Sequence, residues 1–298
     1  MSKYLFVRAI IFVFLTFVFK FSVAQNGRSF RFSENTFVSF SVPRPHDFYK
    51  VELLMKKGVR MVYTYSTKGK YIDSELVVTK YFDSTGLCLE RDDYEAKKLV
   101  SITNYTYLDK QLTMIHILTS SGLYNDIMIT YDYDEAGNKT GQKTYSKYAL
   151  DTTAKYEFRA ERKWEYDSLN HLSSLFDSKN DKLYLSSKYY YSNDTLRLVE
   201  HFDENKKLKS TEYYDYDAKS RMKKIYGRKN KKDLQQEFFY DAVGNFIKEI
   251  DYNTFRSDDI NTLSFTYSDD FLISEAFHSK YDEDINFKCY YFPSVAQD

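Results

Sequence analysis

The 298-residue sequence contains few of the residues that define fibrous or cross-linked proteins: nine glycines, three prolines, two cysteines and one tryptophan. So little glycine excludes a collagen-like chain, and two cysteines are too few for a disulfide-based scaffold. Lysine and arginine together number 43 and are balanced by 43 aspartates and glutamates. The overall charge therefore predicts no strongly charged partner, and we expect no nucleic acid to bind.

Aromatic residues, in contrast, are abundant, with 30 tyrosines and 24 phenylalanines among the 43% of residues that are hydrophobic. A disordered chain carries few such rings, so this composition predicts a folded, water-exposed protein with an apolar core. The length leaves room for about two domains.

The first 24 residues have the pattern of a secretory signal peptide. Lys3 and Arg8 precede an apolar run over residues 9–19, and the small residues Ser-Val-Ala follow at 22–24. The run suits a signal peptide and is shorter than the ~20 residues of a membrane-spanning helix. We expect cleavage after residue 24, export to the periplasm, cell surface or medium, and no membrane span in the mature chain. Lys20, just after the run, leaves an uncleaved anchor as the alternative.

A repeat organises the remaining chain. Its template is an aromatic residue, any residue, Tyr, and then Asp or Ser, with weaker copies at Phe82-Asp83 and Leu108-Asp109. The anchor positions are 24 to 27 residues apart, except for one step of 33 residues. The anchor tyrosines of the strong copies are Tyr133, Tyr166, Tyr191, Tyr216, Tyr240 and Tyr267.

Each copy runs into a predicted turn. An Asp oxygen can accept hydrogen bonds from backbone N–H groups two or three residues later, and Gly or Asn tolerates a positive φ. An apolar residue returns six positions after the anchor, as in Leu172, Met222 and Phe246, so the unit is a strand, a turn and a second strand. The turn-forming aspartates of the template are Asp134, Asp167, Asp217 and Asp241.

The predicted fold is all-β, an antiparallel meander of repeated hairpins with about 16 strands. Reversals every 10 to 15 residues leave no room for ordinary helices. Over residues 156–166 rings alternate with charges, with Arg162 as the one exception on the ring face, so the rings of successive units should form a ladder. A sheet this wide should curl, into a curled single sheet or an open spiral.

Three regions follow from the repeat: the signal peptide at 1–24, a cap or linker at 25–60, and the repeat domain at 61–298. The middle segment does not fit the template and carries two of the three prolines. We expect it to cover the first edge of the sheet, because open arrays need protected ends.

The segments 131–138 and 238–245, Tyr-Asp-Tyr-Asp-Glu-Ala-Gly-Asn and its echo, resemble the YD repeats of the Rhs family. The resemblance covers residues 80–275. In that family such repeats form spiralling antiparallel sheets that can wrap around a toxic cargo, and related repeats occur in large cell-surface adhesion proteins. It implies a β-repeat protein of the bacterial cell envelope, with a toxin-associated fragment as an alternative.

Catalytic and metal-binding motifs are not evident. The histidines lie far apart, and the sequence has no His-Glu-x-x-His, Cys-x-x-Cys, phosphate-binding loop or nucleophile elbow, so we expect no catalytic set, metal or cofactor. Scattered carboxylates could still assemble a glycosidase-like pair. An enzyme should interrupt the repeat where its catalytic groups lie, and only the 33-residue step interrupts it. The histidines are His46, His116, His171, His201 and His278.

Residues 205–232 hold 11 basic and three acidic residues. Such a stretch could bind nucleic acid or an anionic polysaccharide. In a meander, however, alternate turns lie at opposite ends of the strands, which would split this patch and favours solvated turns. The candidate binding residues are Lys206, Lys229, Lys231 and Lys232.

The two cysteines, Cys88 and Cys289, lie at opposite ends of the repeat array. In an open array these ends do not meet, so we expect two thiols rather than a disulfide. The sequence as a whole predicts an exported, non-enzymatic scaffold or binding protein of the cell envelope. Its site would lie on the concave aromatic face or at the Lys-rich turns, and its partner would be an envelope protein or a polysaccharide. The alternative is a carbohydrate-active or other periplasmic enzyme.

Overall fold

The computed structural model describes residues 51–68, 74–120, 126–147, 153–227, 233–252, 260–268, 271–278 and 285–293. The predicted signal peptide and most of the predicted cap lie outside these residues. What is described of the cap is the helix α2 (Val51–Lys56) and the start of the first strand at Val59. No helix among the described residues has both the length and the apolar character needed to span a membrane.

The described chain forms one antiparallel sheet in which each strand pairs with the next. Every connection is a hairpin, as the meander prediction requires. The strands are β1 (Val59–Lys68), β2 (Glu75–Phe82), β3 (Cys88–Glu95), β4 (Lys98–Leu108), β5 (Gln111–Thr119), β6 (Asp126–Tyr133), β7 (Lys139–Lys147), β8 (Glu157–Tyr166), β9 (Leu172–Lys179), β10 (Lys182–Ser192), β11 (Thr195–Phe202), β12 (Leu208–Tyr216), β13 (Met222–Gly227), β14 (Asp233–Tyr240), β15 (Phe246–Asp251), β16 (Asn261–Ser268), β17 (Phe271–His278) and β18 (Ile285–Pro293).

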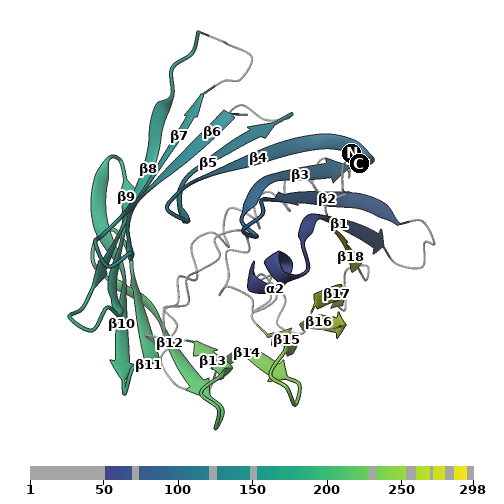
Figure 1. Ribbon diagram of the computed structural model, residues 1–298. Helices are drawn as coiled ribbons and strands as arrows, with labels where there is room; N and C mark the ends of the chain where they lie inside the picture. Colours follow the sequence, from purple (N-terminus) through teal and green to yellow (C-terminus); the bar gives the residue numbers. More distant parts are fainter. Residues whose placement is uncertain are drawn as a thin grey trace, which may run out of the picture.

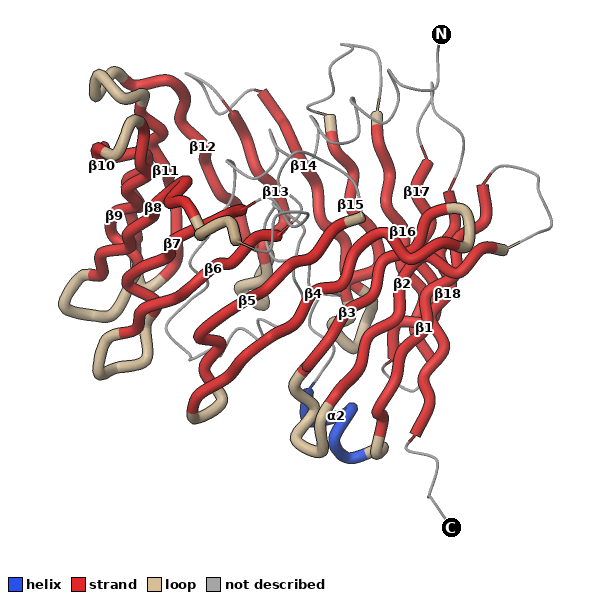
Figure 2. The backbone as a smooth tube through the Cα atoms, turned by 90° about the horizontal axis from the view of Figure 1, so that it is seen from above, coloured by secondary structure: helices blue, strands red, loops and turns tan. Residues whose placement is uncertain are grey.

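The all-β antiparallel meander is present, with 18 strands, but the predicted curled open sheet or spiral is wrong. The first strand, β1, pairs with β2 on one side and with β18 on the other, so the sheet closes into a barrel. Figure 1 shows the ring of strands from one end, with β18 beside β1. Figure 2, turned by 90°, shows the strands side by side across the wall. The predicted need to cap the edge at β1 therefore disappears.

A repeated bulge accounts for the strong curvature. In eight hairpins the register shifts directly before the anchor residue, as between Glu165 and Tyr166 and between Phe239 and Tyr240. A bulge bends its strand and increases the local twist. The same bend in every unit adds up around the sheet, which brings β18 to β1. The sequence predicted curling and did not reveal these bulges.

Five turns with one common geometry lie at one rim of the barrel. In each, an Asp N–H bonds the carbonyl four residues later, and the fourth residue has a positive φ, as at Gly137 (84°) and Asn170 (61°). The template aspartates Asp134, Asp167, Asp217 and Asp241 all begin such turns. Asp83 begins another, while Asp203 begins one at the opposite rim. The weak copy at Leu108 is misplaced by one residue, because Leu108 is 66% exposed and Tyr107 occupies the anchor position.

The two faces of the sheet differ in character. Leu54 of α2, which Figure 1 shows inside the ring, packs in one apolar cluster with Val62 of β1. Side chains in register with Val62 therefore face inward, and two apolar clusters line the inner face. The outward positions of β8 are charged, with Glu161, Lys163 and Glu165. On β8 this alternation separates an inner face with rings from an outer face with charges.

Closure also changes the relation of the two cysteines. Cys88 and Cys289 both belong to the cluster around Leu54, although they lie on β3 and β18. They are present as two thiols, as predicted. The stated reason was wrong, however, since the ends of the array do meet. What separates the cysteines is the pair of strands β1 and β2 between them.

Candidate functional site: the inner wall

The anchor tyrosines lie in a row on the inner wall. Tyr166, Tyr191, Tyr216, Tyr240 and Tyr267 each pack against the large apolar cluster and stay half-buried. Two residues before each anchor, a ring is almost fully buried. These deeper rings are Trp164, Tyr189, Tyr214, Phe238 and Phe265. The sixth anchor, Tyr133, is also half-buried.

Five tyrosine hydroxyl groups tie neighbouring hairpins together. Tyr166 donates to the carbonyl of Lys139 over 2.9 Å, and Tyr240 donates to that of Met222 over 2.9 Å. In each case the acceptor lies at the start of the strand that follows the previous turn. The same bond joins Tyr107 to Cys88, Tyr133 to Leu112, and Tyr291 to Leu272. The template contained a signal for this bond, because its third position is Tyr and not Phe, and only Tyr has the hydroxyl group.

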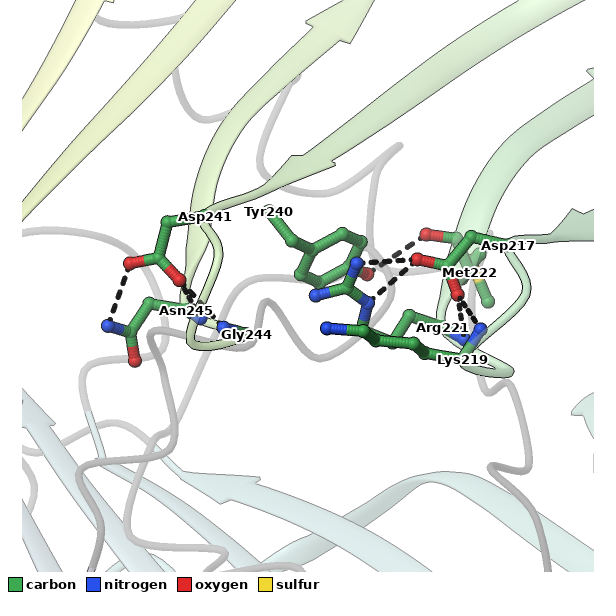
Figure 3. A network of polar contacts seen from close by, with 8 residues as sticks. All are labelled: Asp217, Lys219, Arg221, Met222, Tyr240, Asp241, Gly244 and Asn245. Atoms are coloured by element: carbon green, nitrogen blue, oxygen red, sulfur yellow. Dashed lines mark hydrogen bonds and ion pairs between the residues drawn. The ribbon is translucent and has the colours of Figure 1, made fainter.

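One rim contact links a turn to the ladder, as Figure 3 shows. The Asp217 carboxylate accepts from the backbone N–H groups of Lys219 and Arg221, and its second oxygen accepts from Arg221 Nε at 2.7 Å. The Arg221 guanidinium lies 4.4 Å from the centre of the Tyr240 ring. Burial raises the pKa of Tyr240 to about 12, against the opposing effect of Arg221. The pKa of Asp217 falls because these hydrogen bonds outweigh the upward effect of burial.

The candidate lysines do not join this arrangement. Lys206 lies in the 203–207 turn between β11 and β12, at the opposite rim from the 217–221 turn that holds Lys219 and Arg221. Lys229, Lys231 and Lys232 lie outside the described residues, in the connection from β13 to β14. The basic segment is thus divided between the two ends of the barrel.

Beyond the buried rings the inner wall becomes polar. Arg162 contacts Asp177 at 2.6 Å, two residues before Trp164. Glu212, two residues before Tyr214, accepts from the Tyr214 hydroxyl at 2.7 Å. Further polar residues continue this row, namely Ser187, His201, Gln236 and Glu249. Arg162, the one charge on the predicted ring face, was the first member of this polar row, but the other members were not predicted from the sequence.

Three of these residues have the composition of a hydrolytic triad. The Ser187 hydroxyl lies 3.0 Å from His201 Nδ1, and His201 Nε2 lies 3.5 Å from Glu212 Oε2. The second contact is not a hydrogen bond, so His201 Nε2 has no hydrogen-bond partner among the described residues. Ser187 is only 4% exposed. The proton relay of a triad needs both contacts, so this set is incomplete as it stands.

A second polar network lies at the repeat interruption, on the outward face. The Asp126 carboxylate accepts from the Tyr156 hydroxyl at 2.5 Å and contacts His116 Nε2 at 2.8 Å and Lys147 Nζ at 3.4 Å. Burial raises the Asp126 pKa, yet the hydrogen bonds from Tyr156 and His116 lower it overall. Burial and Asp126 raise the pKa of Tyr156 to about 12.

This network was not found from the sequence, which showed no catalytic set in the 33-residue step. Tyr156 belongs to that step, while His116 and Asp126 precede it and come close only through pairing of β5, β6 and β7. A tyrosine with so high a pKa stays protonated near neutral pH, so Tyr156 acts as a hydrogen-bond donor rather than a base. Among the described residues, no group of three or more His, Cys, Asp or Glu side chains is arranged to hold a metal ion.

Comparisons with known proteins give a general likeness only. No family model matches the sequence. No curated protein matches it either. A porin-like protein from Bacteroides uniformis is 11% identical, and the match covers 78% of this chain and 98% of that one with a TM-score of 0.37. The TcdB2–TccC3 protein without its hypervariable C-terminal region is 12% identical, with 76% and 14% covered and a TM-score of 0.37.

A Bacteroides fragilis protein of unknown function is 20% identical, with 41% of this chain and 86% of that one covered and a TM-score of 0.25. This chain spans only 14% of the TcdB2–TccC3 chains that it matches. At these TM-scores the likenesses support no functional argument. Membership of the YD-repeat family therefore stays a prediction.

Proposed function

We propose that the chain is an exported, non-enzymatic binding scaffold of the cell envelope, of the YD-repeat type, with its ligand site on the inner wall. The observation that carries the proposal is the row of half-buried anchor rings, contributed by six repeats from Tyr133 to Tyr267. Rigid amphipathic rings offer contact area at a low cost in conformational entropy. A row of them suits an extended ligand with apolar faces and hydroxyl groups, and hence a polysaccharide.

Export rests on the signal-peptide pattern of residues 1–24. The protein should be expressed in a bacterial host and its envelope fraction analysed by mass spectrometry of the N-terminal peptide. We expect a mature chain that begins at Gln25. A full-length chain recovered from the cytoplasm would contradict export.

Glycan-array binding, together with pull-down from envelope fractions, tests the ligand site. Tyr216→Leu keeps an apolar side chain and removes an inward ring, while Tyr213→Leu makes the same change on the outward face of the same strand. We expect the Tyr216 variant to lose at least fivefold in glycan affinity and the Tyr213 variant to keep it. Equal affinities of both variants, or a wild-type chain that binds no glycan, would place the site elsewhere.

The second candidate is a hydrolase, which the Ser187–His201 contact of 3.0 Å favours. The wild-type chain and Ser187→Ala should be compared with a serine-reactive fluorophosphonate probe and with ester and glycoside substrates. The scaffold proposal expects no specific labelling and no turnover. Labelling of the wild type that disappears in the variant would make the hydrolase the better assignment.

A further inference from the structure

The helix α2 holds the start of the described chain inside the barrel. Leu54 of α2 is fully buried in one apolar cluster with Val62 and Phe82 of the wall, and Figure 1 shows the helix within the ring. Gly58, with a φ of 65°, turns the chain from this helix into β1. The residues before Val51 therefore join the described chain inside the ring and not on its outer face.

This junction lies at the rim that carries the row of anchor tyrosines. Arg60, at the start of β1, donates to the Asp83 carbonyl over 2.8 Å, and Asp83 begins one of the five turns at that rim. Tyr216 and Tyr240 stand directly before two other turns of the same rim. The helix α2 and the anchor rings are therefore at the same end of the barrel, on its inner face.

The anchor ring beside α2 is more deeply buried than the anchor rings farther away. Phe82, which occupies the anchor position of the first repeat and shares the cluster of Leu54, is 5% exposed. Tyr191, Tyr216 and Tyr240 remain half-buried. The wall away from α2 thus presents ring surface to the interior. Covering this surface is favourable, because it removes apolar area from water.

The segment before α2 has the residues that such a surface accepts. Residues 25–50 lie outside the described ranges, and their sequence holds five phenylalanines and one tyrosine. Phe30 and Phe32 are separated by an arginine, while Val38, Phe40 and Val42 are separated by serines. A period of two places such side chains on one face of an extended chain. The sequence therefore predicts an extended segment with one apolar, ring-bearing face.

The ring is wide enough to hold this segment. Its 18 strands, about 4.8 Å apart, make a wall about 85 Å round and hence a ring about 27 Å across. A chain packed face to face on a sheet lies about 10 Å from it, which is less than the radius of the ring. An extended chain covers about 3.3 Å per residue, so about eight residues cross the ring. Figure 1 shows β12, which carries Tyr216, across the ring from β1.

Attachment to α2 favours this segment over a separate partner. A tethered segment meets its site at an effective concentration in the millimolar range when the linker is short. Residues 43–50 link the apolar stretch to α2, and this linker is long enough to cross the ring. A contact that is too weak to hold a free peptide therefore still holds the tethered one.

We propose that residues 30–42 pack along the row of anchor tyrosines inside the barrel, so that a ligand of the inner wall has to displace them. The phenylalanine rings of the segment would cover Tyr191, Tyr216 and Tyr240. The segment that the sequence predicted as an edge cap would thus cover the inner wall instead. Displacement by a ligand rests on the function proposed above, whereas docking of the segment does not.

Photo-cross-linking in the full mature chain tests the docking. Phe40 is replaced by p-benzoylphenylalanine, and the cross-linked peptides are identified by mass spectrometry. We expect cross-links within one chain to the strands that carry Tyr216 and Tyr240. The same probe in place of Phe239, which is 39% exposed on the outward face, is the control and should not reach residues 25–50. Cross-links of the Phe40 probe to outward residues or to a second chain, or none at all, would overturn the proposal.

Hydroxyl-radical footprinting measures what the segment covers. A full-length variant with four phenylalanines of the segment changed to serine leaves every described residue unchanged. We expect oxidation of Tyr216 and Tyr240 to rise at least threefold in this variant, and oxidation of Tyr213, on the outward face of β12, to stay the same. Equal oxidation of the two inward tyrosines in both chains would contradict docking. If the variant fails to fold, the cross-links decide the question alone. The changes are Phe30→Ser, Phe32→Ser, Phe37→Ser and Phe40→Ser.

A ligand separates docking from displacement. On a glycan that the wild-type chain binds, the serine variant should bind at least fivefold more tightly, because no segment has to be displaced. Equal affinity of the two chains would refute displacement. If the wild-type chain binds no glycan and the cross-links still appear, the glycan site is wrong and the docked segment stands.

Discussion

The Tyr291 hydroxyl donates a hydrogen bond to the backbone carbonyl of Leu272 over 2.6 Å. This is the bond by which the earlier anchors, such as Tyr166 and Tyr240, hold the preceding hairpin. Tyr291 is therefore the anchor of a ninth repeat, whose first strand is β18. Its second strand is β1, and the register Val62 with Tyr291 joins the two. The barrel thus consists of eight hairpins and a ninth pair of antiparallel strands, β18 and β1, that no turn joins.

Tyr291→Phe removes this bond, so the Leu272 carbonyl loses the hydroxyl donor. We expect a loss of about 0.5–1.5 kcal/mol in the free energy of unfolding, measured by urea denaturation. Tyr290→Phe is the control, because Tyr290 is 47% exposed and points to the outer face, and it should change stability by less than about 0.5 kcal/mol. Equal effects of the two variants would show that the bond at the closure contributes nothing.

Acid should destabilise the turn rim. The pKa values of Asp167, Asp217 and Asp241 are lowered, since backbone hydrogen bonds outweigh the upward effect of burial. A carboxylate with a lowered pKa stabilises the fold above its unfolded pKa of about 3.9, and the contribution disappears as the pH falls through the folded value. Stability should therefore fall below about pH 4.

Asp217→Asn should make the free energy of unfolding less dependent on pH in this acid range. At neutral pH it should lower that free energy by up to about 1 kcal/mol, because the pairing with Arg221 is removed. Asp134→Asn provides a comparison, since Asp134 faces the Asn138 amide instead of an arginine. Chemical denaturation at a series of pH values measures both. An unchanged pH profile of the Asp217 variant would mean that its carboxylate does not contribute.

The two thiols should differ in reactivity. Burial raises the pKa of Cys88 to about 11, and the thiolate is the reactive form, so Cys88 should react slowly in the native protein. Cys289 is only half-buried. With Ellman's reagent at pH 8 we expect one faster thiol in the native chain, lost in Cys289→Ser, and two thiols after denaturation. Equal native rates would contradict the burial of Cys88.

The ladder should dominate stability. Phe246 is 1% exposed and its ring centre lies 5.0 Å from that of Phe265, so Phe246→Ala should cost about 3–5 kcal/mol. Phe239→Ala makes the same change on the outward face of the neighbouring strand, where the ring is 39% exposed, and should cost less than about 1.5 kcal/mol. Calorimetric melting of both variants measures the difference. Similar losses would mean that the inner rings are not the main core.

Local structure was predictable where side-chain chemistry determines it. The turn at Asp167 follows from an Asp oxygen that accepts backbone bonds and an Asn that tolerates a positive φ. The weak copy at Leu108 failed because its turn contains only two residues, Asp109 and Lys110, both with positive φ. A turn of that length places the preceding tyrosine, and not the leucine, on the inner face.

Long-range features were less predictable. No residue in the sequence marks β1 and β18 as partners, because their pairing depends on curvature accumulated over all the hairpins. The polar residues of the inner wall, such as Glu212, look like ordinary strand charges until alternation is counted from the buried ring at Tyr214. The Tyr156 network joins residues up to 40 positions apart, and only strand pairing brings them together.

The strands β18 and β1 pair like the two strands of a hairpin, although no turn joins them. The ring of strand pairings therefore does not depend on which hairpin comes first in the chain. Val59 and Pro293 are in register where the two strands meet, so a short linker there would complete the ninth hairpin. Opening the chain at another hairpin, such as the 203–207 connection, would then leave all the strand pairings of the ring in place. The order in which the units assemble would change, and the assembled ring would not.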